Sequence, residues 1–231
     1  MLCLLPKTQN KISMLNNYKK LSTGAIKQII IEPFKYDIDY VKKTYDDNYG
    51  IQCDMMSHLR YGFIVGSTNR KPQSILDVGY GNGSFLKICQ NAKIETFGTD
   101  ISKYELKYGK FLDFDKCFDR FFDVVTFFDS LEHFDDISFL GKLKCNYVCI
   151  SLPNCSYNTI EKIDGVEQSD IYFENFKHRK PNEHIWHFDI KSLDKTMESY
   201  GYSLVNFEYV EDVIRKGIGN FPNILTAIFK K

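Results

Sequence analysis

The sequence has no long apolar run, and this absence narrows the classes of protein to which the chain could belong. No stretch approaches the roughly 18 apolar residues that a membrane-spanning helix needs, so we expect no transmembrane segment. Residues 1–6 are apolar, but they are too few for a signal peptide, and basic residues follow them rather than precede them. We therefore expect a cytoplasmic protein without a membrane partner.

Net charge and regular cysteine spacing are absent as well. Lys plus Arg and Asp plus Glu both number 30, so the formal net charge is zero. A balanced chain has no global attraction for phosphate backbones, which leaves only a local basic patch for contacts with nucleic acid. The seven cysteines show no C-x-x-C spacing, which favours reduced thiols. There is no internal repeat, and 231 residues suffice for one large domain with a buried core.

A strand, a glycine turn and a helix start follow one another in residues 74–86, which read SILDVGYGNGSFL. The apolar start predicts a buried strand, and Gly79, Gly81 and Gly83 stand at alternate positions after it. Glycine lets the backbone turn sharply and approach a ligand without an intervening Cβ. The stretch therefore predicts a nucleotide-binding loop in an α/β sheet.

The spacing of these glycines distinguishes between cofactors. Nicotinamide-binding loops have G-x-G-x-x-G, whereas this chain has G-x-G-x-G with Asp77 two residues before the first glycine. The motif resembles that of the class I S-adenosylmethionine-dependent methyltransferases, and the resemblance extends from about Ser74 to the C-terminus. It implies that Asp77 lies near the amino group of the cofactor's methionine. Asp100 follows a second predicted strand, Glu95–Thr99, where a carboxylate can take both ribose hydroxyls.

The resemblance implies a set of cofactor-binding residues at the strand ends. They are Asp77, Gly79, Tyr80, Gly81, Gly83, Asp100, Ile101, Asp113, Phe128 and Asp129. An NAD enzyme and an unrelated strand-loop-helix are the weaker interpretations of the same stretch, because no later segment suggests hydride chemistry.

Predicted strands and helices alternate after the glycine turn. Strands are predicted at residues 95–99, 110–112, 123–128, 146–152, 203–210 and 223–229, and helices at 85–91, 102–108, 136–143 and 192–200. This alternation predicts a parallel sheet covered on both faces. The last two strands have no helix between them and can pair as a hairpin. The predicted fold class is α/β, a Rossmann-like doubly wound seven-stranded sheet, mostly parallel with an antiparallel C-terminal hairpin.

The domain organisation follows from the same pattern. Residues 1–70 are interpreted as an N-terminal cap or helical extension, with helices expected at 37–45 and 52–65, and residues 71–231 as the methyltransferase domain. His58 and Arg60 are expected on a solvated helix surface. Residues 155–189 are too many for a simple connection and are predicted to form a substrate lid.

Chemistry-bearing residues follow the strand at residues 123–128. Asp129, Glu132 and His133 stand close together there, and residues 183–184 add a further acidic residue and His184. Carboxylates and imidazoles from one turn suit Mg²⁺ or Mn²⁺.

This segment resembles two groups of O-methyltransferases. One is the ubiquinone-biosynthesis enzymes, in which carboxylate-x-x-Glu-His holds Mg²⁺. The other is the small-RNA 3′-terminal 2′-O-methyltransferases, in which a His after an acidic residue joins the motif downstream of a Ser-x-Pro-Asn strand end. This chain has S-L-P-N at residues 151–154 and then Glu183-His184, in that order. It differs from the RNA enzymes by having Asp129 in place of Glu, and His187-Phe188 in place of Glu-Trp.

Several roles stay open for these residues. In one interpretation Asp129, Glu132, His133 and His184 hold a metal that lowers the pKa of the acceptor hydroxyl. In another no metal is used, Glu132 caps a helix, and His133 or His184 acts as the base. In the third interpretation the histidines have a purely structural role. Glu132, His133 and His184 are the candidate catalytic residues.

The sequence predicts an S-adenosylmethionine-dependent methyltransferase that O-methylates a hydroxyl of a small molecule or sugar. One alternative is metal-dependent 2′-O-methylation of an RNA end, with Lys177, Arg179 and Lys180 on phosphate. Another is a non-catalytic partner subunit that binds S-adenosylmethionine. N-methylation of DNA bases is disfavoured, because the Asx-Pro-Pro-aromatic motif of those enzymes is missing after residue 128. No feature of the sequence predicts an oligomeric state.

Overall fold

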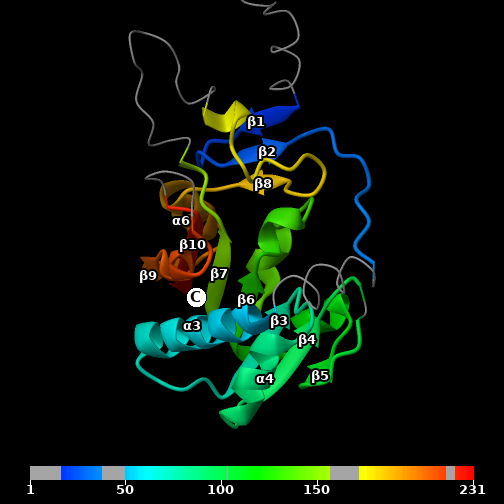
Figure 1. Ribbon diagram of the computed structural model, residues 1–231, viewed down its shortest axis with the longest axis vertical. Helices are drawn as coiled ribbons and strands as arrows, with labels where there is room; N and C mark the ends of the chain where they lie inside the picture. Colours follow the sequence, from blue (N-terminus) through cyan, green and yellow to red (C-terminus); the bar gives the residue numbers. More distant parts are fainter. Residues whose placement is uncertain (1–16, 38–49, 103, 157–171, 217–221) are drawn as a thin grey trace, which may run out of the picture.

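The computed structural model describes residues 17–37, 50–102, 104–156, 172–216 and 222–231 (Figure 1). Its centre is a seven-stranded sheet in the order β5-β4-β3-β6-β7-β10-β9. The strands are β3 (Ser74–Val78), β4 (Glu95–Thr99), β5 (Lys110–Phe111), β6 (Phe121–Phe128), β7 (Lys144–Pro153), β9 (Ser203–Glu208) and β10 (Ile224–Lys230). Strands β3 to β7 pair in parallel, and β10 runs antiparallel to both β7 and β9. The predicted fold class is confirmed.

Helices cover both faces of this sheet. The helices are α3 (Gly50–Thr68), α4 (Ser84–Asn91) and α6 (Ile190–Ser199). Alternate residues of a strand face opposite sides. Ile75 accordingly packs in one core cluster with Leu86 of α4, whereas its neighbour Leu76 packs in the other with Leu193 of α6. The result is three layers, with α3 and α4 side by side on one face (Figure 1).

Local sequence accounts for the borders of these elements. Seven of the eight residues of β6 are buried, as a central strand covered on both faces requires. Helix α6 begins at Asp189, whose side chain accepts a hydrogen bond from the backbone N–H of Ser192, while the Ser192 hydroxyl is paired with the Asp189 backbone N–H. The chain leaves α6 through Gly201, whose φ is 86°.

Three helix predictions had different outcomes. The helix predicted at 52–65 is confirmed as the longer α3. The helix predicted at 102–108 is wrong for the described residues 104–108, where the chain is irregular. The segment at 136–143 forms only a 3₁₀ turn, η4 (Ser138–Lys142). The helix predicted at 37–45 lies almost wholly outside the described residues. None of the helices that the structure describes is long and apolar enough to cross a membrane.

A second, three-stranded sheet was not predicted. It joins β1 (Tyr18–Lys20), β2 (Ile26–Gln28) and β8 (Trp186–His187) in that order, with β2 antiparallel to both neighbours. It lies beyond the carboxyl end of β7, because Asn154 forms a bridge with Phe188 (Figure 1). Part of the predicted lid, residues 172–189, is therefore built together with the N-terminal segment; residues 157–171 of that lid lie outside the described residues.

Candidate active site

The glycine loop after β3 adopts a conformation that favours glycine. Gly79, Gly81 and Gly83 have φ angles of 81°, 55° and 78°, in the left-handed region that other residues rarely adopt. A Cβ on Gly79 would lie 2.6 Å from the Cβ of Ser130, which follows β6. The loop therefore depends on glycine for its backbone angles and for its close contact with the neighbouring strand end.

Asp100 holds this loop against the end of β4. Its Oδ2 accepts a hydrogen bond from the Gly81 backbone N–H at 3.0 Å, and its Oδ1 accepts from the backbone N–H and hydroxyl of Ser102 at 2.8 and 2.6 Å. These bonds stabilise the turn of the chain after β4. They also fix the carboxylate at the rim of a cavity.

That cavity has a volume of about 390 Å³. Six of the predicted cofactor residues line it: Gly79, Gly81, Asp100, Ile101, Asp113 and Asp129. Apolar side chains that follow β4, β5 and β6 complete it, among them Phe114 and Phe134, and Tyr36 of the N-terminal segment contributes as well. We call it the smaller cavity. Asp77, Tyr80 and Phe128 line the neighbouring cavity instead, and Gly83 lines neither of the two.

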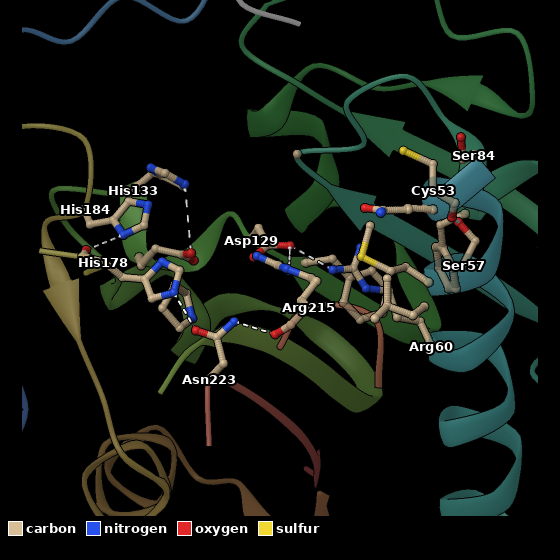
Figure 2. Close-up of a pocket in the computed structure, with 18 of the residues that line it drawn as sticks. Cys53, Ser57, Arg60, Ser84, Asp129, His133, His178, His184, Arg215 and Asn223 are labelled. Carbon is tan, nitrogen blue, oxygen red and sulfur yellow. Dashed lines mark hydrogen bonds and ion pairs between the residues drawn. The ribbon is translucent and has the colours of Figure 1, made fainter. Parts of the chain in front are cut away.

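The larger cavity has a volume of about 520 Å³ and shares Gly79, Asp129 and His133 with the smaller one. Its walls come from segments far apart in the sequence: α3, the glycine loop, residues 177–184, and residues 214–216 with Asn223. Figure 2 shows the imidazoles of His133, His178 and His184 grouped on one side, α3 with Arg60 on the other, and Asp129 with Arg215 between them.

Asp129 belongs to a cluster of four charges in which Arg60 and Glu211 are buried and Asp129 and Arg215 are partly buried. Its carboxylate accepts hydrogen bonds from Arg60 Nη2 at 2.8 Å and from Arg215 Nη1 at 2.8 and 2.9 Å. Glu211, whose side chain is 0% exposed, accepts from the same two arginines at 2.7 to 3.0 Å and from the Ser151 hydroxyl. Burial alone would raise the pKa of Asp129, but the charges of Arg215 and Arg60 outweigh it and hold this pKa well below its usual range.

Glu132, only three residues later, has the opposite environment. It is 1% exposed, and neither of its carboxylate oxygens has a hydrogen-bond partner among the described residues. Burial, reinforced by the nearby charge of Asp129, raises the pKa of Glu132 well above its usual range. A buried carboxylate without partners is costly for a fold and calls for an explanation.

Two imidazoles face this carboxylate. One ligand atom each from Glu132, His133 and His184 can be chosen so that all three lie within 4.8 Å of one another. His133 Nδ1 lies 2.7 Å from the carbonyl oxygen of Glu183, and His184 Nδ1 lies 2.8 Å from that of His178. A carbonyl can only accept, so each Nδ1 carries the hydrogen and each Nε2 is left with a lone pair. Burial lowers the pKa of both histidines, that of His184 to about 2, so they are neutral.

The structure thus unites three of the four predicted metal ligands and separates the fourth. Glu132, His133 and His184 converge, whereas both oxygens of Asp129 are bound by guanidinium groups. Arg60, expected on a solvated surface, is 9% exposed and buried in the charge cluster, while His58 is exposed as expected.

Four contributing residues had no signal in the sequence that marked them as part of the site. They are Tyr36, Arg60, Glu211 and Arg215. Each acts through partners that are distant along the chain; Glu211, for example, pairs with an arginine 151 residues away.

Comparisons with known proteins agree with this geometry. A family model described as a methyltransferase domain matches residues 56–206. No curated protein matches the chain. Magnesium protoporphyrin IX methyltransferase from Synechocystis PCC 6803, solved with bound SAH, has a TM-score of 0.52 and 14% identity over 86% of this chain and 90% of that chain. A SAM-dependent methyltransferase from Archaeoglobus fulgidus has a TM-score of 0.52 and 18% identity, over 84% and 100%.

A further similar structure is the methyltransferase domain of bacterial CtHen1-C. Its TM-score is 0.50 and its identity 17%, over 74% of this chain and 96% of that chain. At these identities the similarity concerns the fold.

Proposed function

Because this chain belongs to the methyltransferase-domain family and has the class I S-adenosylmethionine-dependent fold, we propose that it methylates a hydroxyl group of a small molecule or sugar. The observation that carries this proposal is the unpaired Glu132 carboxylate facing two imidazole lone pairs where the cavities meet. A hydroxyl is a weak nucleophile near neutral pH, and these groups are of the kind that activates one.

The two cavities suit the two reactants. The smaller, more apolar cavity would hold the adenosine of the cofactor, with Asp100 available for the ribose. Asp77, which lines the larger cavity, would bind the amino group. Gly79, Asp129 and His133 are common to both cavities and would surround the sulfonium of a bound cofactor. The acceptor enters the larger cavity, and its hydroxyl approaches the methyl group in line with the sulfur.

Glu132, His133 and His184 fit a divalent cation. Their donor set is one carboxylate and two imidazole nitrogens, which suits Mn²⁺ and is compatible with Mg²⁺. A cation also compensates the buried charge of Glu132, whose carboxylate oxygens have no hydrogen-bond partner among the described residues. Asp129 lines the site but is paired with Arg60 and Arg215 and is not part of this donor set. When bound, the cation lowers the pKa of the acceptor hydroxyl and orients it.

The chain's own groups have separate tasks. Glu132 supplies negative charge, and the Nδ1–H groups of His133 and His184 are held by carbonyl oxygens so that both Nε2 atoms face inward. In the interpretation without a metal, one of these lone pairs accepts the hydroxyl proton. A lone pair cannot bind a cation and accept a proton at once, so the two interpretations are separable by experiment.

The test is formation of SAH from S-adenosylmethionine with a panel of sugars and small alcohols, after chelation and after adding back Mn²⁺ or Mg²⁺. We expect turnover only with the cation, and its loss in Glu132→Gln. Asp135→Asn is the matched control, because the side chain of Asp135, in the segment after η3 (Leu131–His133), is 74% exposed. Full activity of Glu132→Gln after chelation would refute a role for the cation and would favour the interpretation in which a histidine acts as the base.

One observation favours a second acceptor, an RNA end. Lys177, Lys180 and Lys216 lie at the larger cavity and are exposed, and Lys177 and Lys216 form no ion pair among the described residues. Arg179, predicted to contact phosphate, lies over the Phe173 ring at 5.9 Å and donates to the Glu174 carbonyl oxygen instead. Affinity for short single-stranded RNA that falls steeply with salt would favour this acceptor; salt-independent binding of a neutral sugar would favour the first.

A further inference from the structure

The N-terminal segment, which lies outside the region that the family model matches, reaches into the active site. The match begins at residue 56, whereas residues 29–37 leave the small sheet (Figure 1), and Tyr36 among them lines the smaller cavity. The start of this segment is fastened to residues 172–189. Gln28 and Asn182 exchange two hydrogen bonds of 2.8 Å through side chain and backbone, and the Glu32 backbone N–H donates to Asn182 Oδ1 at 3.1 Å.

The far end of the segment places Tyr36 against His133. The Tyr36 hydroxyl oxygen lies 2.7 Å from His133 Nδ1 and 3.1 Å from the Glu183 carbonyl oxygen. His133 Nδ1 itself lies 2.7 Å from that carbonyl oxygen. The Tyr36 and His133 rings meet edge to face at 5.3 Å between centroids. Three groups from three distant segments therefore form one closed hydrogen-bond triangle.

Only one arrangement of hydrogens satisfies this triangle. The carbonyl oxygen of Glu183 has two lone pairs and no hydrogen, so it accepts from both Tyr36 O–H and His133 Nδ1–H. If Nδ1 instead accepted from Tyr36, its lone pair would face that of the carbonyl oxygen at 2.7 Å, which is repulsive. Tyr36 therefore adds a second acceptor beside Nδ1–H, its own hydroxyl oxygen, and keeps the hydrogen on Nδ1.

We propose that Tyr36 is a positioning residue for His133: its hydroxyl is a second acceptor beside the Glu183 carbonyl oxygen, holds the imidazole ring and reinforces the tautomer in which Nε2 presents a lone pair to Glu132 and His184. This inference rests on the proposed function of those three residues. The free energies of the two neutral tautomers differ little in water, and the hydrogen bond at one nitrogen selects which nitrogen is left to bind or accept. The ring of His184 is positioned in a similar way by the His178 carbonyl oxygen. The rings of His178 and His184 also lie nearly parallel, with an angle of 9° between their planes.

Tyr36 also lines the smaller cavity. Its ring and its hydroxyl consequently have separable roles, since the ring borders the proposed adenosine site and the hydroxyl holds His133. Tyr36→Phe keeps the ring and removes only the hydroxyl. Tyr61→Phe is the matched control, because Tyr61 is a partly buried tyrosine of α3 whose hydroxyl makes no hydrogen bond among the described residues.

Two measurements on the full chain test the proposal. In the first, Mn²⁺ binding is titrated by electron paramagnetic resonance and SAH binding by calorimetry. Loss of an outer partner of a metal-binding histidine typically weakens metal affinity about 10–100-fold, so we expect that loss for Tyr36→Phe, with SAH affinity within about twofold of the parent. Tyr61→Phe changes neither. Equal Mn²⁺ affinity in Tyr36→Phe and the parent overturns the proposal, and so does a parallel loss of both affinities, which would indicate a structural role.

The second measurement needs no metal. Long-range ¹⁵N–¹H spectra of the histidines report which ring nitrogen carries the hydrogen. We expect His133 to carry it on Nδ1 in the parent. In Tyr36→Phe the Nδ1–H group keeps the Glu183 carbonyl oxygen as acceptor but loses the tyrosine hydroxyl, so we expect the fraction of this tautomer to fall. An unchanged tautomer refutes the role of Tyr36. If the parent protein binds no Mn²⁺, the part of the proposed function that involves a cation is refuted. The spectra still decide whether Tyr36 positions His133.

Discussion

The two cavities that meet at Gly79 are built in different ways. The smaller one is lined mostly by residues that directly follow β3, β4, β5 and β6, so short stretches of sequence define it. The larger one draws on α3, residues 177–184 and the segment after β9, and ion pairs join α3, the end of β6 and the segment after β9. A site made of strand ends depends on local backbone geometry, whereas a site made of distant segments depends on the contacts between them.

The largest effect is expected where the larger cavity is held together. Arg60→Met leaves Asp129 and Glu211 to share Arg215, and loss of one partner from a buried ion pair typically costs about 3–5 kcal/mol. We expect that loss in the free energy of unfolding, measured with urea.

Lys110→Met is the control for this change. Lys110 pairs with Glu95 at 3.2 Å, with the two side chains 69% and 44% exposed, and such exposed pairs contribute about 0–1 kcal/mol. Equal stability of Arg60→Met and Lys110→Met would contradict the view that buried charges join the walls of the larger cavity.

In the smaller cavity we expect a change of backbone conformation to weaken cofactor binding. Gly79→Val places a β-branched residue at a φ of 81° with its Cβ 2.6 Å from Ser130. Backbone strain of about 1–3 kcal/mol and displacement of the loop should weaken SAH binding by about 100-fold or more, measured by calorimetry. Gly62→Ala in α3 is the control, since no atom lies within 4 Å of the added Cβ. If Gly79→Val binds SAH as tightly as the parent does, the glycine loop is not part of the cofactor site.

The smallest effect is expected at Asp77, which lines the larger cavity, and this effect depends on pH. Burial raises the pKa of Asp77 to about 6, although the hydroxyl of Thr126 donates to the carboxylate at 2.7 Å. Below that pH the side chain is neutral and loses its attraction for the cofactor's ammonium group. We expect calorimetric SAH affinity to fall with pH below about 6, by up to tenfold per pH unit. Asp77→Asn should flatten this profile; a profile that keeps its slope would assign the titration to another group.

Prediction from sequence succeeded where structure is local. The glycine loop and the buried strand β6 follow from periodicity and from the backbone freedom of glycine, so the predicted sheet is confirmed. The small sheet was missed because β1 and β2 have three residues each, too few for a periodic pattern, and because β2 pairs with β8, which lies about 160 residues further along the chain. Arg60 was misjudged because a helix position does not reveal that Glu211 will cover it.

The sequence by itself determined the α/β sheet, the glycine loop and the presence of two carboxylates in one turn, because steric and periodic constraints act between neighbours in the chain. Only the tertiary structure decided which of those carboxylates is available for chemistry. Arginines from α3 and from the segment after β9 reach Asp129 and leave Glu132 without a hydrogen-bond partner among the described residues. The charge and reactivity of a buried group depend on what surrounds it in space, and residues three positions apart can have opposite surroundings.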